Sequence, residues 1–133
     1  MKYSIPDEIR FTRDHVWIRM CDDFIGRCGI SGQKAESMGE AVFIDFPEID
    51  IEVRAGEKVA AIESHFEIFP LRAPVSGVIT AINGILGNEP SRLNKDPYGE
   101  GWIFSIDVKE PIEFLETLSE DEYRTYVAAE GDI

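Results

Sequence analysis

Short runs of apolar residues recur along the chain, and turn-forming residues separate them, which is a pattern typical of β-strands. The expected strands are residues 16–18, 24–30, 41–46, 58–63, 75–83 and 101–107. Pro47 and Gly56 mark two of the turns between them. Many short strands with Gly and Pro turns predict a mainly β protein built as a sandwich or flattened barrel.

Helix signals occur only beside this strand pattern. Ser31 is placed to cap a short helix directly after Ile30, and Gly39 is placed to end it. Ser119 and Glu122 form a capping-box pattern for a C-terminal helix that we expect to run to about residue 129, before Gly131. Because no linker-like or low-complexity segment interrupts the chain, residues 1–133 are predicted to form a single domain.

Charge narrows the classes of partner. The chain has 26 acidic and 13 basic residues, and its net charge of -13 repels phosphate backbones and anionic lipids, so nucleic acid and membrane are poor partners. No stretch approaches the roughly 20 apolar residues of a membrane span. The opening residues MKYSIPDEIRF lack the features of a secretory or transit signal, so the chain is expected to be cytoplasmic.

Cys21 and Cys28 are the only thiols. If residues 17–30 form a hairpin that turns near Cys21, the two cysteines do not face each other, and a disulfide is not expected. Neither is a metal site, because no second pair of Cys or His residues stands nearby to complete four ligands. We expect one cysteine in a turn and the other buried in a strand.

Residues 63–77, ESHFEIFPLRAPVSG, break a strand-like run at a turn, and the segment contains no lysine. Together with the other motifs of the chain, this segment resembles the H protein of the glycine cleavage system, a relative of lipoyl and biotinyl carrier domains. The resemblance rests on FTRDHVW at 11–17, GIS at 29–31, GEAVFIDFPEID at 39–50, AGEKVAAIES at 55–64, APVSGVITAIN at 73–83 and LNKDPYGEGW at 93–102.

This resemblance implies a lipoyl-type β-sandwich that serves glycine decarboxylation within the glycine cleavage complex. It also implies four protein partners: glycine decarboxylase, aminomethyltransferase, dihydrolipoyl dehydrogenase and a lipoate ligase. In the family, lipoic acid acylates a lysine on the central hairpin, and the resulting arm carries an aminomethyl group. Aligned without a gap, that lysine falls on Phe66, which has no amine, so no cofactor is expected.

The first hypothesis is therefore a docking or regulatory homologue that keeps the scaffold and lacks the arm. Apolar side chains at an exposed turn are suited to anchor a partner, and Phe66 is expected to be more exposed than Phe69 and Leu71, for which folding back onto the sheet stays open. Acidic residues between Glu36 and Glu52 are expected to attract basic partners. The candidate partner-binding residues are Glu63, Ser64, His65, Phe66, Glu67, Ile68 and Phe69.

Three alternatives remain. In the first alternative, the chain is a working lipoyl carrier modified at an atypical lysine, and lipoate is its cofactor, although no lysine lies between Lys58 and Lys95. In the second alternative, the chain is a protein-binding module of another lipoate-dependent assembly. Finally, His65 with Glu63 or Glu67 forms an acid–base or metal site, a weak signal because catalysis also needs a pocket and orienting groups. The chain is not expected to be an enzyme.

Overall fold

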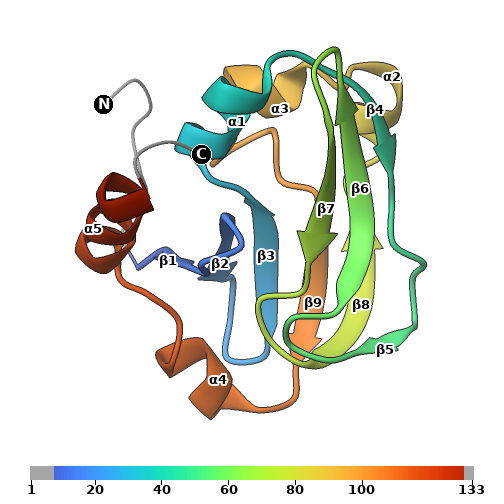
Figure 1. The fold of residues 1–133 in the computed structure, drawn as a ribbon. Helices are drawn as coiled ribbons and strands as arrows, with labels where there is room; N and C mark the ends of the chain where they lie inside the picture. The colour runs from blue at the N-terminus through green and yellow to red at the C-terminus, as the bar shows by residue number, and fades with distance from the viewer. Residues whose placement is uncertain (1–7, 131–133) are drawn as a thin grey trace.

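A computed structural model of the chain describes residues 8–130, which fold into two antiparallel β-sheets that pack face to face (Figure 1). The six-stranded sheet has the order β1-β2-β3-β9-β8-β5, and the three-stranded sheet has the order β4-β6-β7. The strands are β1 (Arg10–Phe11), β2 (Val16–Met20), β3 (Ile25–Ile30), β4 (Ala41–Asp45), β5 (Glu52–Val53), β6 (Lys58–Ser64), β7 (Ile68–Arg72), β8 (Gly77–Ile82) and β9 (Phe104–Val108). This architecture confirms the predicted mainly β sandwich.

Alternation along the strands explains the core between the sheets. In β6 the side chains of Ala60, Ile62 and Ser64 are buried, whereas Glu63 is exposed, and in β7 Phe69 and Leu71 face inward. Side chains that alternate in this way place one apolar face of each strand in the core. The strand β7 was not predicted, because Pro70 lies in its middle and proline argues against a central strand. Proline is tolerated in an edge strand, and β7 is an edge strand of the three-stranded sheet.

The helices are α1 (Gly32–Met38), α2 (Ile85–Asn88), α3 (Arg92–Lys95), α4 (Pro111–Leu115) and α5 (Glu120–Glu130). The predicted N-cap of α1 is confirmed, since Ser31 Oγ accepts a hydrogen bond from the Lys34 N–H at 3.1 Å. Gly39 follows α1 with φ 81°, a conformation that favours glycine. Helices α1, α2 and α3 gather at the end of the sandwich where the β6–β7 hairpin turns (Figure 1).

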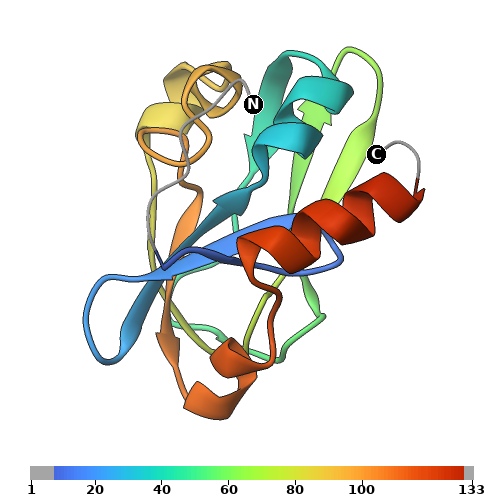
Figure 2. The same cartoon turned by 90° about the vertical axis from the view of Figure 1, so that its left-hand side faces the viewer.

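The C-terminal helix α5 lies across the β1–β2 end of the larger sheet (Figure 2). Its capping box is confirmed: Ser119 N–H donates to Glu122 Oε1 at 2.9 Å, and Glu122 N–H donates to Ser119 Oγ at 3.2 Å. The expected stop at Gly131, like residues 1–7 of the opening segment, lies outside the described residues. Beneath α5 an aromatic cluster forms, in which the rings of Phe11 and Tyr123 stack with centroids 4.5 Å apart.

The two cysteines lie as predicted. Strands β2 and β3 form a hairpin, Cys28 is buried in β3, and Cys21 is exposed in the turn between the strands. Both thiols are free. Burial holds the pKa of the Cys28 thiol well above its ordinary value, so Cys28 behaves as a small apolar residue of the core.

Candidate functional site at the hairpin tip

The turn between β6 and β7 is closed by the hydroxyl group of Ser64. Its Oγ accepts hydrogen bonds from the Phe66 and Glu67 N–H groups, both at 3.2 Å, and donates to the Met38 carbonyl at 2.7 Å. The Ser64 N–H also donates to the Glu67 carbonyl at 2.9 Å. Because Met38 is the last residue of α1, these bonds fix the hairpin tip against that helix.

A second contact ties α1 to the tip. Lys34 Nζ lies 2.7 Å from Glu67 Oε1 and 4.6 Å from the centroid of the Phe69 ring, and the Lys34 side chain is only 7% exposed. An ammonium group removed from water needs a carboxylate or an aromatic face to offset its lost hydration, and Lys34 has both. The sequence did not predict this ion pair, because 33 positions separate its partners.

Phe66 stands at the tip with 81% of its surface exposed. Its ring lies over Gly39, so closely that an added Cβ at residue 39 would lie 2.6 Å from the ring. Asn94 holds this part of the chain in place, because its Nδ2 donates to the Gly39 carbonyl at 2.8 Å. The most exposed apolar side chain of the hairpin is therefore supported from below and presented to solvent, as predicted for Phe66.

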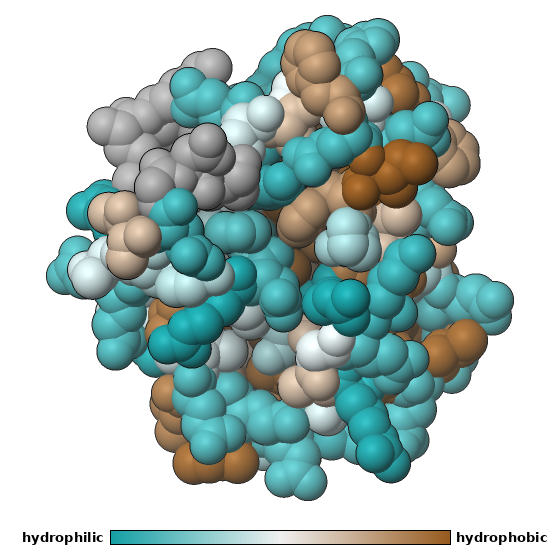
Figure 3. Space-filling view, in the orientation of Figure 1, coloured by the Kyte–Doolittle hydropathy of each residue, from teal (hydrophilic) through white to brown (hydrophobic). Residues whose placement is uncertain are grey.

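Further apolar side chains continue from the tip onto the outer face of the three-stranded sheet. Phe43 pairs with Glu63, and Glu63 pairs with Ile68, so the three residues form a row across β4, β6 and β7. Phe43 is 57% exposed and Ile68 is 68% exposed. We call Phe43, Glu63, Phe66 and Ile68 the hairpin surface, and Figure 3 shows apolar atoms gathered around this end of the β6–β7 hairpin among hydrophilic neighbours.

The structure separates the predicted partner-binding residues into two groups. Glu63, His65, Phe66, Glu67 and Ile68 are exposed, whereas Ser64 and Phe69 are buried. Ser64 and Phe69 therefore support the tip from inside. Leu71 is also buried, so the side chains of both Phe69 and Leu71 fold back onto the sheet. Phe43 was not among the predicted residues, because only the pairing of β4 with β6 brings it beside the hairpin.

The described residues around His65 do not form a metal site. Within residues 8–130, no group of three or more His, Cys, Asp or Glu side chains is arranged to hold a metal ion. Glu67 is instead paired with Lys34, and His65 is exposed on the turn.

The second histidine of the chain, His15, lies near the start of α1, at the opposite end of that helix from the hairpin tip. His15 Nδ1 and Ser31 Oγ each hydrogen-bond to the Tyr123 hydroxyl at 2.7 Å, which links the start of β2, the cap of α1 and α5. Burial lowers the pKa of His15, and the positive charge of Lys34 lowers it further. Burial also raises the pKa of Tyr123, so this network is neutral near pH 7 and joins the elements that support the hairpin.

The hairpin tip does not fit a covalently attached lipoyl group. Amide formation requires a primary amine, and the exposed side chain of Phe66 has none. Lys58 starts β6 and pairs with Arg72 at the far end of the hairpin, and the ammonium of Lys34 is engaged by Glu67. The chemistry that these residues offer is apolar contact beside an acidic side chain.

Comparison with known proteins identifies the family. The model of the glycine cleavage H-protein family matches residues 9–130. The chain belongs to the glycine cleavage H-protein family. The resemblance found in the sequence motifs is thereby confirmed over the whole fold, including the hairpin that carries Phe66.

Individual H proteins match over almost their full length. A probable glycine cleavage system H protein of Haloarcula marismortui is 35% identical over 127 residues, which cover 96% of this chain and 99% of the relative. The H protein of Coxiella burnetii is 37% identical over 128 residues, covering 96% of this chain and 98% of the relative. A crystal structure of an H protein from Mycobacterium marinum superposes with a TM-score of 0.78 at 32% identity, covering 96% of this chain and 99% of that one.

Family membership fixes the general role. Homology supports a glycine cleavage H-protein function for this chain, and H proteins are lipoyl carriers without catalytic activity of their own, so the chain is not an enzyme. Protein partners within the glycine cleavage complex follow from the same family. In the described part of the chain, no helix is long and apolar enough to cross a membrane.

Proposed function

We propose that this chain is a non-lipoylated H-protein homologue that docks onto protein partners through the hairpin surface and acts as a docking or regulatory subunit. The proposal rests on Phe66, which is 81% exposed at the hairpin tip. Phe66 falls on the family's lipoyl-lysine position when the motifs on either side of it are aligned without a gap. Shuttling requires an amine at that position, but docking does not, so the scaffold retains one property without the other.

Preorganisation of the tip supports a docking role. The turn is held by Ser64, the Lys34–Glu67 ion pair and the contact of Phe66 with Gly39, so its apolar side chains lose little freedom when a partner binds. Large apolar side chains at a rigid, protruding site are the type that dominates interface energies. The partners proposed are those of the family: glycine decarboxylase, aminomethyltransferase and dihydrolipoyl dehydrogenase. A cytoplasmic location stays a prediction from the sequence.

A second candidate function is lipoate carriage on an atypical lysine, and one observation favours a specific residue. Lys95 is exposed at the end of α3 and lines the same hollow as Gly39, the residue beneath the Phe66 ring. This hollow places a free amine on the hairpin side of the molecule. A lipoate ligase that recognises the scaffold would have to accept a helix end in place of a hairpin turn.

Lipoylation is tested by intact mass and peptide mapping after co-expression with a lipoate ligase and supply of lipoic acid. The wild type is expected to stay unmodified, whereas Phe66→Lys gains one lipoyl group. A lipoyl group on the wild type overturns the proposal. If Lys95→Arg abolishes that modification, Lys95 is the acceptor and the carrier function is restored.

Docking is tested separately by pulldown with the purified glycine decarboxylase, aminomethyltransferase and dihydrolipoyl dehydrogenase of the same organism. Phe66→Ser is expected to weaken capture about tenfold or more without unfolding the domain, because the side chain is exposed. Arg54→Ser is the matched control, since Arg54 is exposed in the turn before β6, at the far end of that strand from the tip. Equal capture of wild type and Phe66→Ser removes the anchor role.

A further inference from the structure

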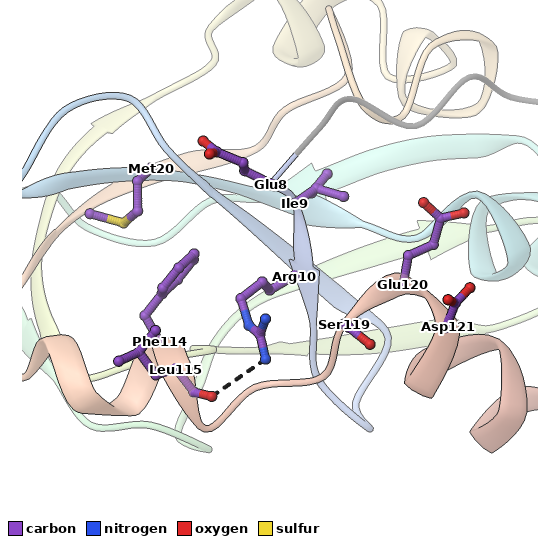
Figure 4. Close-up of a pocket in the computed structure, with 9 residues that line it drawn as sticks. All are labelled: Glu8, Ile9, Arg10, Met20, Phe114, Leu115, Ser119, Glu120 and Asp121. Atoms are coloured by element: carbon purple, nitrogen blue, oxygen red, sulfur yellow. Dashed lines mark hydrogen bonds between the residues drawn. The ribbon is translucent and has the colours of Figure 1, made fainter.

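A groove is lined by residues of α4, the start of α5 and the end of β2 (Figure 4). These elements lie away from the hairpin tip, as the ribbon in Figure 1 shows. It encloses about 630 Å³, and its apolar wall is formed by Ile9, Met20, Phe114 and Leu115. A neighbouring hollow of about 300 Å³ shares Met20, Phe114 and Leu115 and extends to the β2–β3 turn. Because these residues border both hollows, the two are adjacent, and we call them together the α4 groove.

The groove is held in shape by Arg10. Its Nη2 donates to the Leu115 carbonyl at 3.4 Å (Figure 4). Its Nε donates to Thr117 Oγ1 at 3.0 Å, and its Nη2 also donates to the Thr117 carbonyl. The guanidinium group also lies over the Phe114 ring, 5.9 Å from its centroid. Arg10 therefore fixes the segment between α4 and α5, and the groove is formed before any ligand arrives.

The rim of the α4 groove is acidic. Glu120 and Asp121 form ion pairs with Arg124, but Glu8, Asp22 and Asp23 have no ion pair within residues 8–130. Asp22 accepts hydrogen bonds from the Ile25 and Phe24 N–H groups, which lower the pKa of its carboxyl group and keep it ionised. A ligand with positive charges beside an apolar face would complement both the rim and the wall.

Leu115 of the groove and two residues next to its lining residues in the sequence are exposed apolar side chains. Leu115 is 65% exposed, and Ile112 of α4 and Phe24 of the β2–β3 turn are exposed to a similar degree. Exposed apolar side chains that gather beside a groove and are rimmed by charged residues are typical of an interaction site. A second copy of the chain is a poor occupant, because each copy carries a net charge of -13 and brings an acidic rim.

We propose that the α4 groove is a docking site for a basic amphipathic helix of another protein, whose apolar face packs against Met20, Phe114 and Leu115. This mode of binding places the apolar face of a helix in a groove and its charged flanks against the rim. The site is independent of the hairpin surface. A chain with both sites would bridge two partners held at its opposite ends.

The probe for this proposal is a synthetic helical peptide of leucine and lysine with all leucines on one face, and a scrambled peptide of the same composition is its control. Fluorescence anisotropy is expected to show the amphipathic peptide binding about tenfold more tightly than the scrambled one. Leu115→Ser is expected to remove that preference, and Phe66→Ser to leave it unchanged. Amide chemical shifts on peptide addition are expected to change around α4 and the β2–β3 turn.

Each contrary result overturns the proposal. Equal binding of both peptides reduces the site to general charge attraction, and unchanged binding by Leu115→Ser removes the groove from the contact. Loss of binding in Phe66→Ser moves the peptide to the hairpin surface. Sedimentation equilibrium showing a dimer that Leu115→Ser dissociates assigns the groove to a second copy instead.

Circular dichroism of Leu115→Ser verifies that this variant is folded. Asp23→Asn alters only an exposed turn residue, and this second variant is also expected to weaken peptide binding.

Discussion

Lys34 is a nearly buried cation whose charge is balanced across the fold by Glu67 on the hairpin. The two partners differ in exposure, because the Lys34 side chain is 7% exposed and the Glu67 side chain is 39% exposed. Removing either partner therefore has unequal effects: an unpaired Glu67 can be hydrated, whereas an unpaired Lys34 cannot. This asymmetry gives the pair a testable signature at the scale of single residues.

We predict that Glu67→Gln lowers the free energy of unfolding by about 1–3 kcal/mol, because it leaves the buried ammonium without its charged partner. Lys34→Met is expected to cost less, since its apolar side chain fills the same space and Glu67 turns to water. Urea denaturation of both variants and of the double variant measures the difference. If Lys34→Met lowers the free energy of unfolding more than Glu67→Gln does, the predicted asymmetry of the ion pair is wrong.

His15 gives the second prediction at this scale. Burial and the charge of Lys34 lower its pKa below 6.5, so the unfolded chain takes up a proton at a higher pH than the folded chain does. The free energy of unfolding is therefore expected to fall as the pH drops below about 6.5. His15 has φ 68°, which asparagine also tolerates, and His15→Asn is expected to flatten this fall. Denaturation at pH 7.5 and 5.5 compares the two proteins; parallel losses would exclude His15 as the cause.

At the scale of elements, the junction between α1 and β4 supports the hairpin tip. Gly39 ends α1 in the left-handed region, and its bare Cα lets the Phe66 ring lie against the backbone. A single glycine thus serves both the end of a helix and the seat of an aromatic side chain. The consequence is that a change at Gly39 alters the tip without touching it directly.

Gly39→Ala is expected to lower the free energy of unfolding by about 1–2 kcal/mol through its positive φ, and to push the Phe66 ring from its seat. The double variant Gly39→Ala with Phe66→Ala separates these effects, because the small side chain at 66 removes the steric contact and leaves the backbone cost. Thermal denaturation of the single and double variants is the measurement. If the loss of stability in the double variant equals the sum of the losses in the two single variants, the Phe66 ring and Gly39 are not coupled.

At the scale of the whole molecule, the net charge of -13 acts on every encounter with a basic partner. The association rate of the cationic amphipathic peptide is expected to fall about tenfold or more from low to physiological salt, with a smaller change in the dissociation rate. Stopped-flow fluorescence at several salt concentrations measures both rates. An association rate that does not change with salt would contradict electrostatic steering.

Most of the local structure could be predicted from the sequence, but few of the contacts between distant segments could. Alternating strands and the caps at Ser31 and Ser119 follow from neighbouring residues, and the structure confirms them. Helices α2, α3 and α4 have only four or five residues, too few for a helical period to show. The Lys34–Glu67 pair depends on how α1 packs against the hairpin, and the α4 groove depends on where the segment before α5 runs, which no local pattern encodes.

The position of Cys21 has a practical consequence. Its thiol is exposed in the β2–β3 turn, directly before Asp22 and Asp23 of the groove rim, while the Cys28 thiol is buried. A maleimide dye would therefore label the native chain at a single place, without any substitution. A fluorophore attached there would change colour or intensity when the groove is filled, so the protein supplies its own optical reporter for the discovery of a natural ligand.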